Sequence, residues 1–132
     1  MSRKLLVDTS IWIEYFRGRL PDAAAIELGL GQGTVFVTGP ILAELLQGVR
    51  DAGEAEQLRR CIDAIPYEEC RLEDWLAAGE AAFALRRKGM VIPLTDLVIA
   101  MVAKRIGAAV YSLDKHFTEI EGVSLRTGGK PA

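Results

Sequence analysis

The segment Leu5-Leu6-Val7-Asp8-Thr9-Ser10 decides the fold class of this chain. Three consecutive apolar residues that end at a polar one are typical of a short strand buried on both faces. Asp8, Thr9 and Ser10 carry side chains that cap the start of a helix, and that helix is predicted to run through Phe16. A strand that leads through an acidic turn into a helix is typical of parallel α/β folds.

The remaining sequence repeats this alternation of strands and helices. The pattern predicts further strands at 34–38, 108–113 and 123–125, and helices at 21–28, 41–49, 52–65, 73–88 and from 95 onward, with a short helical turn at 116–117. Together these elements predict a three-layer α/β/α sandwich with a central parallel sheet.

Three of the predicted helices carry more detailed expectations. The glycines at positions 29, 31 and 33 are expected to end the second helix near Leu28. The helix that begins near 95 is apolar almost all round, so we expect it in the middle of the fold. The helix at 52–65 is expected to bury one stripe of residues, which consists of Leu58, Cys61, Ile62 and Ile65.

Chain length and charge limit the possible architectures. The chain has 132 residues, and 50% are hydrophobic, which suffices for one core but not comfortably for two domains. We expect a single domain over 1–132, with a core from about 4 to 125 and a frayed tail at 127–132. The formal net charge of -2 gives no reason, from composition alone, to expect a phosphate-rich partner.

Cysteine usage and hydropathy indicate the cellular compartment. Cys61 and Cys70 form no CxxC pair, which is typical of a reduced, cytosolic protein, and we expect both side chains to be buried or half-buried. The apolar start is broken at Asp8, which argues against a signal peptide. The longest later apolar stretch, 97–103, is far shorter than the ~20 residues that span a bilayer. We therefore expect a soluble, cytoplasmic protein with no membrane segment.

Four carboxylates, those of Asp8, Glu44, Asp96 and Asp114, lie where a strand ends or a helix has just begun. In a parallel sheet these positions share one edge, where ligands bind, so we expect the four acids to meet there. Gathered carboxylates need a cation between them, and oxygen-rich clusters suit Mg²⁺ or Mn²⁺. The pattern therefore predicts a divalent-metal site of the kind that metal-assisted hydrolases use.

Two hydroxyl groups strengthen the prediction of a metal site. Thr9 adjoins Asp8. Ser112 lies two residues before Asp114, so the side chains of Ser112 and Asp114 point to the same side of their strand. We expect Thr9 and Ser112 to support the carboxylates by orienting them or a ligand oxygen.

Each acid also has an ordinary structural explanation. Asp8 can be an N-cap, Asp96 a first-turn acid, Glu44 a solvated helix residue and Asp114 a turn former. What these explanations do not account for is why all four positions fall on one predicted edge. His116 is the single histidine of the chain, and with no obvious partner for nucleophilic catalysis we expect a surface or cap residue.

Four motifs together resemble the PIN domain, and most closely its bacterial toxin branch, the ribonuclease subunit of VapBC-type toxin-antitoxin pairs. They are Leu6-Val7-Asp8-Thr9-Ser10, Pro40-Ile41-Leu42-Ala43-Glu44-Leu45, Thr95-Asp96-Leu97-Val98-Ile99-Ala100 and Ser112-Leu113-Asp114-Lys115-His116-Phe117. The resemblance runs from Lys4 to about Leu125, with the motifs in the family's order and at its usual separations. One departure is Leu113, where relatives often carry a polar or basic residue.

The resemblance implies a Mg²⁺- or Mn²⁺-dependent endoribonuclease that is the toxin of a type II toxin-antitoxin pair. In such an enzyme Asp8, Glu44, Asp96 and Asp114 would be catalytic and would hold the metal ions. The implied reaction is in-line hydrolysis of an RNA phosphodiester by an activated water.

The resemblance also implies partners. A small VapB-type antitoxin would repress the shared operon and lay its tail across the toxin, commonly offering an arginine to the acids, and the toxin itself would form a homodimer. The first helix has more apolar area than one buried face requires, so we expect Trp12, Tyr15 and Phe16 to contact the antitoxin.

Other functions remain open from the sequence. A PIN-like nuclease could act alone in RNA processing or on DNA, although those enzymes usually carry extra acids and insertions. A Mg²⁺-binding receiver-like signalling module is a distant alternative, because it needs an acid pair after the first strand, where this chain has Asp8 alone. A pure binding module would tolerate the loss of Asp96.

Overall fold

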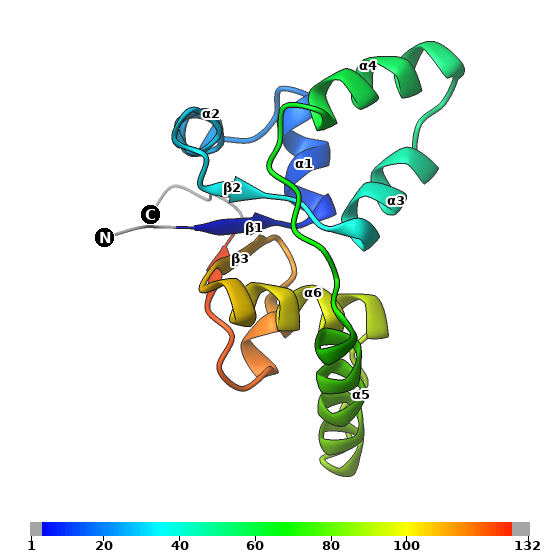
Figure 1. Cartoon of the computed structure of the whole chain (residues 1–132), viewed down its shortest axis with the longest axis vertical. Coiled ribbons are helices and arrows are strands. Elements are labelled where there is room, and N and C mark those ends of the chain that lie inside the picture. The colour runs from blue at the N-terminus through cyan, green and yellow to red at the C-terminus, as the bar shows by residue number, and fades with distance from the viewer. Residues whose placement is uncertain (1–3, 128–132) are drawn as a thin grey trace.

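A parallel four-stranded sheet forms the centre of the molecule (Figure 1). The structure is a computed structural model, and it describes residues 4–127. The strands lie in the order β2-β1-β3-β4, and their bounds are Leu5–Val7 for β1, Val35–Phe36 for β2, Ala109–Ser112 for β3 and Leu125–Thr127 for β4. β1 lies inside the sheet, with Leu5 opposite Val35 on one side and opposite Ala109 on the other.

Helices cover both faces of this sheet, which confirms the predicted α/β/α architecture. The helices are α1 (Thr9–Phe16), α2 (Ala23–Gln32), α3 (Gly39–Gln47), α4 (Ala52–Ile62), α5 (Leu72–Arg87) and α6 (Leu94–Ile106), and a 3-10 helix, η1, spans Lys115–Glu119. In Figure 1, α1, α3 and α4 lie above the strands, and α6 with α5 beside it lies below.

The helix α6 is the most buried element of the fold. Its residues from Leu97 to Ala103 are all buried, as the uninterrupted apolar sequence predicted. α6 is tied to α5 by Arg105, whose Nη2 donates to Asp74 Oδ2 at 2.9 Å. The Nη1 of Arg105 donates to Glu68 Oε2, in the segment before α5, at 3.1 Å. Burial alone would raise the pKa of Asp74, but the hydrogen bonds and charge of Arg105 hold it below its usual value. Arg105 and Asp74 therefore hold α5 against α6.

The second helix differs from its prediction, because α2 continues through Gly29 and Gly31 and ends only at Gly33. Gly33 takes a positive φ of 71° and closes the helix as a left-handed cap. Gly29 has a packing role: a Cβ there would lie 2.3 Å from Val35 Cγ2. The glycine lets α2 approach β2 closely, so the residue that was expected to end the helix instead seats it on the sheet.

The helix α4 also corrects a prediction, because none of its residues is buried. Leu58 and Ile62 are half-buried, and Cys61 is exposed instead of lying in a buried stripe. Only Ile65, which follows the helix, is buried as expected, and Cys70 is half-buried. α4 stands away from the sheet because its apolar side chains face α1 and α3, across a groove described below.

The last strand, Leu125–Thr127, begins two residues later than predicted. Thr127 is therefore part of the sheet and not of a frayed tail, and the rest of the predicted tail, 128–132, lies outside the described residues. Arg126 of this strand pairs with Asp22 and lies over the ring of Tyr111, 4.9 Å from its centroid. Within residues 4–127, no helix is both long and apolar enough to cross a membrane.

Candidate metal and active site

The four acids come from four different elements. Asp8 follows β1 and is the N-cap residue of α1, Glu44 lies in α3, Asp96 is in the first turn of α6, and Asp114 precedes η1. The strands are parallel, so these positions share the carboxyl edge of the sheet. Asp8, Glu44 and Asp114 all lie close enough to Asp96 for their charges to raise its pKa, so the structure brings the four acids together.

Asp8 is held by a network of hydroxyl groups. Its side chain makes no capping hydrogen bond to α1, which argues against the explanation of this residue as only an N-cap. Instead Asp8 Oδ2 accepts from Ser112 Oγ at 2.8 Å and from Ser10 Oγ at 3.3 Å. Ser112 Oγ in turn accepts from the backbone N–H of Asp114 at 2.9 Å. Asp8, Ser112 and Asp114 are thereby fixed relative to one another across two strands.

Glu44 reaches the same edge from α3. Its Oε1 accepts a hydrogen bond from Thr9 Oγ1 at 2.7 Å, so the residue next to Asp8 orients the second carboxylate. The supporting positions that the sequence suggested, Thr9 and Ser112, each hold one carboxylate directly. Ser10 adds a third such contact, which the sequence analysis treated only as a capping position.

Burial and the neighbouring acids oppose the ionisation of Asp96. Burial raises the pKa of Asp96 to about 6, the charge of Asp8 adds to the increase, and Glu44 and Asp114 add further. His116 opposes this rise. Three neighbouring acids oppose the ionisation of this carboxyl. A bound cation would offset their repulsion.

His116 does not occupy the surface or cap position that the sequence suggested. Its Nε2 lies 2.9 Å from Asp96 Oδ2, and its Nδ1 lies 3.0 Å from Asp114 Oδ1, with the side chain about a quarter exposed (26%). The contact depends on how η1 turns His116 back toward α6, and no spacing along the sequence links positions 96 and 116. The only available signal was its place two residues after Asp114.

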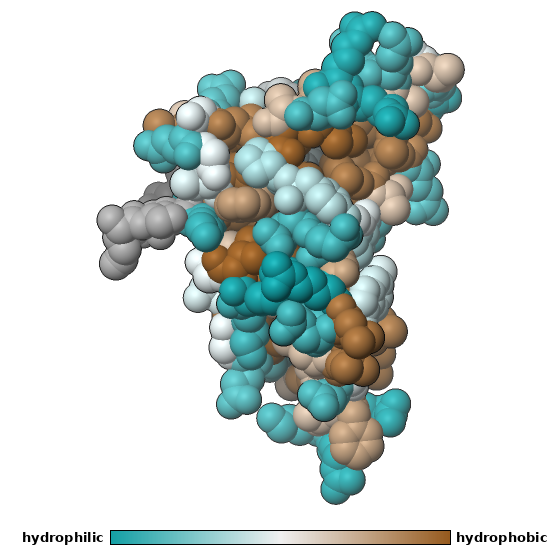
Figure 2. All heavy atoms as spheres, viewed as in Figure 1, coloured by the Kyte–Doolittle hydropathy of each residue, from teal (hydrophilic) through white to brown (hydrophobic). Residues whose placement is uncertain are grey.

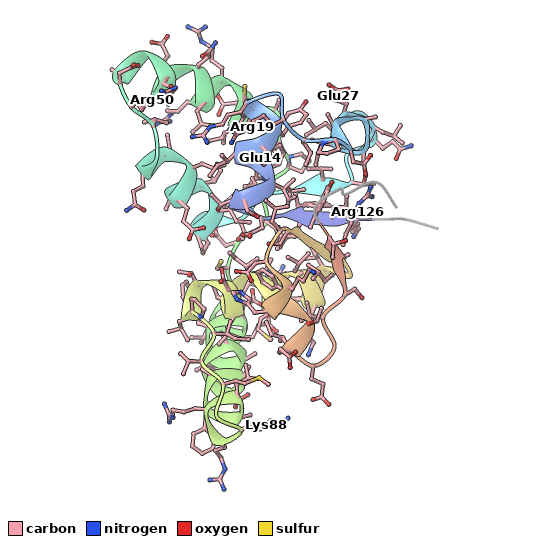
Figure 3. All side chains as sticks on the ribbon, turned by 180° about the vertical axis from the view of Figure 1, so that it is seen from behind. Glu14, Arg19, Glu27, Arg50, Lys88 and Arg126 are labelled. Atoms are coloured by element: carbon pink, nitrogen blue, oxygen red, sulfur yellow. The ribbon has the colours of Figure 1, made fainter. Side chains whose placement is uncertain are left out.

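A groove adjoins the acids between α1, α3 and α4. Its volume is about 410 Å³, and it is lined by Ile13, Phe16, Arg17, Glu44, Leu45, Gly48, Val49, Arg50, Glu54, Gln57, Leu58 and Cys61. In Figure 2, apolar side chains gather below α4, between it and α3. Figure 3 shows the same region from behind, with Arg50 near α4 and the pair Glu14 and Arg19 at the end of α1. Glu44 belongs both to this groove and to the acidic cluster.

Comparison with known proteins decides the family. The model of the PIN domain family matches residues 5–123 of this chain. The chain belongs to the PIN domain family. A VapC ribonuclease of Mycobacterium bovis and ribonuclease VapC11 of Mycobacterium tuberculosis are each 31% identical to it over 126 residues, covering 91% of this chain and 93% of the relative.

Solved structures agree with this assignment. The VapBC2 complex of Rickettsia felis, bound to a DNA fragment from its promoter, contains a chain that matches this PIN domain with a TM-score of 0.78 and 25% sequence identity. The match covers 93% of this chain and 97% of that chain. Membership of the PIN family sets aside the receiver-like alternative.

The residues of this PIN domain fit a divalent ion, on which nucleases of the family generally depend. Asp96, Asp114 and His116 each offer one ligand atom, and these atoms lie within 4.8 Å of one another. His116 Nε2 is buried and has no hydrogen-bond partner among the described residues, although Asp96 is close. The carboxylate oxygens of Asp96 and Asp114 are donors that both Mg²⁺ and Mn²⁺ accept.

The expected antitoxin contacts of α1 need one correction. Trp12 is fully buried, at 0% exposure, because it packs in the core beside Ile11. A side chain without exposed surface cannot contact a partner, so Trp12 is a core residue. Tyr15 is half-buried and Phe16 is 40% exposed, and Phe16 lines the groove.

Proposed function

We propose that this protein is the toxin of a type II toxin-antitoxin pair and acts as a Mg²⁺-dependent endoribonuclease. The observation that carries the proposal is the meeting of Asp8, Glu44, Asp96 and Asp114 at one sheet edge in a PIN domain. Its relatives at 31% identity over most of the chain are named VapC ribonucleases. RNA is the substrate in this proposal, and the cytoplasm, where cellular RNA is translated, is the compartment.

The proposed roles follow from the contacts of each side chain. Asp8, which is buried, and Asp96, which is half-buried, would hold the metal most directly, and Glu44 and Asp114 would complete the site. Thr9 and Ser112 keep Glu44 and Asp8 aimed at the cluster. A bound Mg²⁺, for which Mn²⁺ is the alternative, would neutralise the acids and supply Lewis acidity toward an RNA phosphate.

Cleavage of total RNA by antitoxin-free protein, with DNA as a parallel substrate, tests this function. We expect discrete cuts with Mg²⁺, none with EDTA, and a loss of at least about 100-fold in rate for Asp96→Asn. The matched control is Glu121→Gln, which changes an exposed acid outside the cluster and should leave the rate unchanged. Mapping the cut ends identifies the RNA.

Three results of this experiment would contradict the proposal. Cutting that persists in EDTA would remove the metal from the mechanism. Cutting of DNA in preference to RNA would favour the alternative of a PIN nuclease acting on DNA. Cleavage confined to a precursor RNA that the cell normally matures would favour a stand-alone processing enzyme.

The groove between α1, α3 and α4 supports a cognate VapB-type antitoxin as the partner. Its apolar lining, which includes Phe16 and Leu58, fits apolar side chains of a docked segment. Because Glu44 lies in the same groove, a cationic side chain of that segment would reach the acids directly.

Replacement of Phe16 tests the antitoxin contact. We expect Phe16→Glu to weaken antitoxin binding by at least about 10-fold, since it places a charge in an apolar contact. RNA cleavage by the free toxin should not change. Leu28→Glu, on the exposed side of α2, is the matched control. Equal binding by both variants would place the antitoxin elsewhere.

Two features of α5 support a homodimer. Leu72, Leu76 and Phe83 are all more than half exposed and share one side of the helix, and Figure 2 shows apolar surface along it. The helix has acidic residues in its first turn and Arg86 and Arg87 in its last. Two copies of α5 that pair about a two-fold axis perpendicular to the helix run antiparallel, so each acidic start would meet a basic end.

A single domain over the whole chain is part of the same proposal. One cluster of buried side chains runs from Leu5 to Ile120 and includes residues of β1, α1, α6 and β3. No second core is needed to account for the described residues.

A further inference from the structure

His116 lies between two acids of the proposed metal site. Nε2 is 2.9 Å from Asp96 Oδ2, and Nδ1 is 3.0 Å from Asp114 Oδ1. The imidazole therefore bridges α6 and the end of β3, two elements that each contribute a carboxylate. A ring in this position can either replace a cation or share in binding one.

The lack of a hydrogen-bond partner at Nε2 favours a role for His116 in binding the cation. This atom is buried, yet among the residues that the structure describes it has no hydrogen-bond partner, because the short contact to Asp96 lacks the alignment of a hydrogen bond. An unsatisfied buried nitrogen is costly unless it serves a purpose. Asp96, Asp114 and His116 already offer ligand atoms within 4.8 Å of one another.

The backbone around His116 holds the ring in place. The N–H of His116 donates to Asp114 Oδ1 at 3.2 Å, so the histidine and the acid belong to one capped turn. The next residue, Phe117, is fully buried and anchors η1, and the two rings lie 5.0 Å apart. The imidazole is thus positioned before any ion binds, as an effective ligand needs to be.

We propose that His116 is a nitrogen ligand of the divalent ion, through Nε2, and that it makes the site prefer Mn²⁺ to Mg²⁺. Mg²⁺ is a hard cation that takes oxygen ligands, whereas sites with nitrogen ligands bind divalent ions of the first transition row, and Mn²⁺ is one of these. An all-carboxylate site offers no such discrimination. The inference rests on the proposed metal-dependent function, and it names a ligand beyond the four acids.

Electron spin echo spectroscopy of the Mn²⁺-loaded protein tests the ligand directly. His116 is the single histidine of the chain, so an imidazole nitrogen coupled to Mn²⁺ in tag-free protein can come from no other residue. We expect this coupling in the wild type and in Lys115→Ala, an exposed neighbour, and its loss in His116→Ala. Absence of the coupling in folded, Mn²⁺-loaded wild type would overturn the proposal.

Metal titration by calorimetry provides a second readout. For His116→Ala we expect Mn²⁺ binding to weaken by at least about 10-fold and Mg²⁺ binding to change by less than about 3-fold. His116→Gln, whose amide group reaches about as far as Nε2, guards against a general disturbance of the turn. Equal weakening for both metals in both variants would show that His116 only positions the acids, against the proposal.

These measurements need no RNA, so they separate this inference from the proposed function. Nitrogen coupling in a protein that cuts no RNA would keep the ligand and reject the ribonuclease. Metal-dependent RNA cleavage without nitrogen coupling would keep the ribonuclease and reject the ligand.

Discussion

Asp96 is a residue at which the proposed metal site and the stability of the fold make opposite demands. Burial, and then the charges of three neighbouring acids, raise its pKa from the ordinary value of 3.8 to about 6. A group whose pKa is raised in the folded protein contributes stability at pH values below its pKa in the unfolded chain. This contribution is lost as the pH rises through the folded-state pKa of about 6. Above pH 6 the metal-free protein therefore carries an unfavourable charge at this position, which a bound ion would compensate.

We therefore predict that Asp96→Asn stabilises the metal-free protein at pH 7.5. Each pKa unit corresponds to about 1.4 kcal/mol, so the expected gain in the free energy of unfolding is about 1–3 kcal/mol. At pH 4, where the carboxyl is mostly protonated, the gain should be small. Urea unfolding in EDTA at both pH values measures it, with Glu121→Gln as the control. A loss of stability at pH 7.5 would contradict the assigned strain.

Which residues meet at the site could be predicted from the sequence where their position along a strand or helix determines their place in the fold. Asp8 and Asp114 follow strands, and Asp96 begins a helix, so their meeting follows from parallel topology alone. The contact of His116 with Asp96 depends on how η1 folds back after β3, which no local pattern encodes. The burial of Trp12 depends on which face of α1 meets the sheet.

Within one element, α2, two glycines have different roles. A Cβ at Gly29 would meet Val35 at 2.3 Å, whereas nothing lies within 4 Å of the corresponding position at Gly31. We predict that Gly29→Ala destabilises the protein by about 1–3 kcal/mol, because α2 must move away from β2. Thermal or urea unfolding measures the change.

Gly31→Ala is the matched substitution in the same helix. Since Gly31 is exposed and helical, replacing it should stabilise the protein by about 0.5–1 kcal/mol through helix propensity. Equal effects at both positions would show that close packing against Val35 is unimportant. This distinction explains why the end of α2 was predicted too early. Helix propensity alone cannot distinguish a glycine that packs closely from a glycine that ends a helix.

For the whole molecule, the exposed side of α5 predicts the oligomeric state. We predict that Leu76→Glu converts the antitoxin-free protein from dimer to monomer, because a charge in the apolar stripe opposes an identical charge across a two-fold axis. Sedimentation equilibrium measures the mass. Lys88, at the far end of α5 in Figure 3, provides the control: Lys88→Ala should leave the dimer intact. A monomeric wild type would contradict the proposed pairing.

The sequence was most informative about the overall architecture of the molecule. Alternating strands and helices predicted the layers and the parallel sheet, and the all-apolar stretch from Leu97 to Ala103 predicted the central helix. The groove was not predictable, because it arises from α4 standing away from the sheet, a feature of tertiary packing. Periodicity in α4 shows which side is apolar but not whether a core covers it.

The distribution of the acids along the chain also affects when the protein can act. The first, Asp8, leaves the ribosome long before the last, Asp114, and the neighbouring strand β4 ends at Thr127. At synthesis rates of about 5–20 residues per second, roughly 5–20 seconds separate the two acids. A half-made chain therefore holds no complete metal site, and the proposed nuclease cannot cut RNA around the ribosome that is still making it.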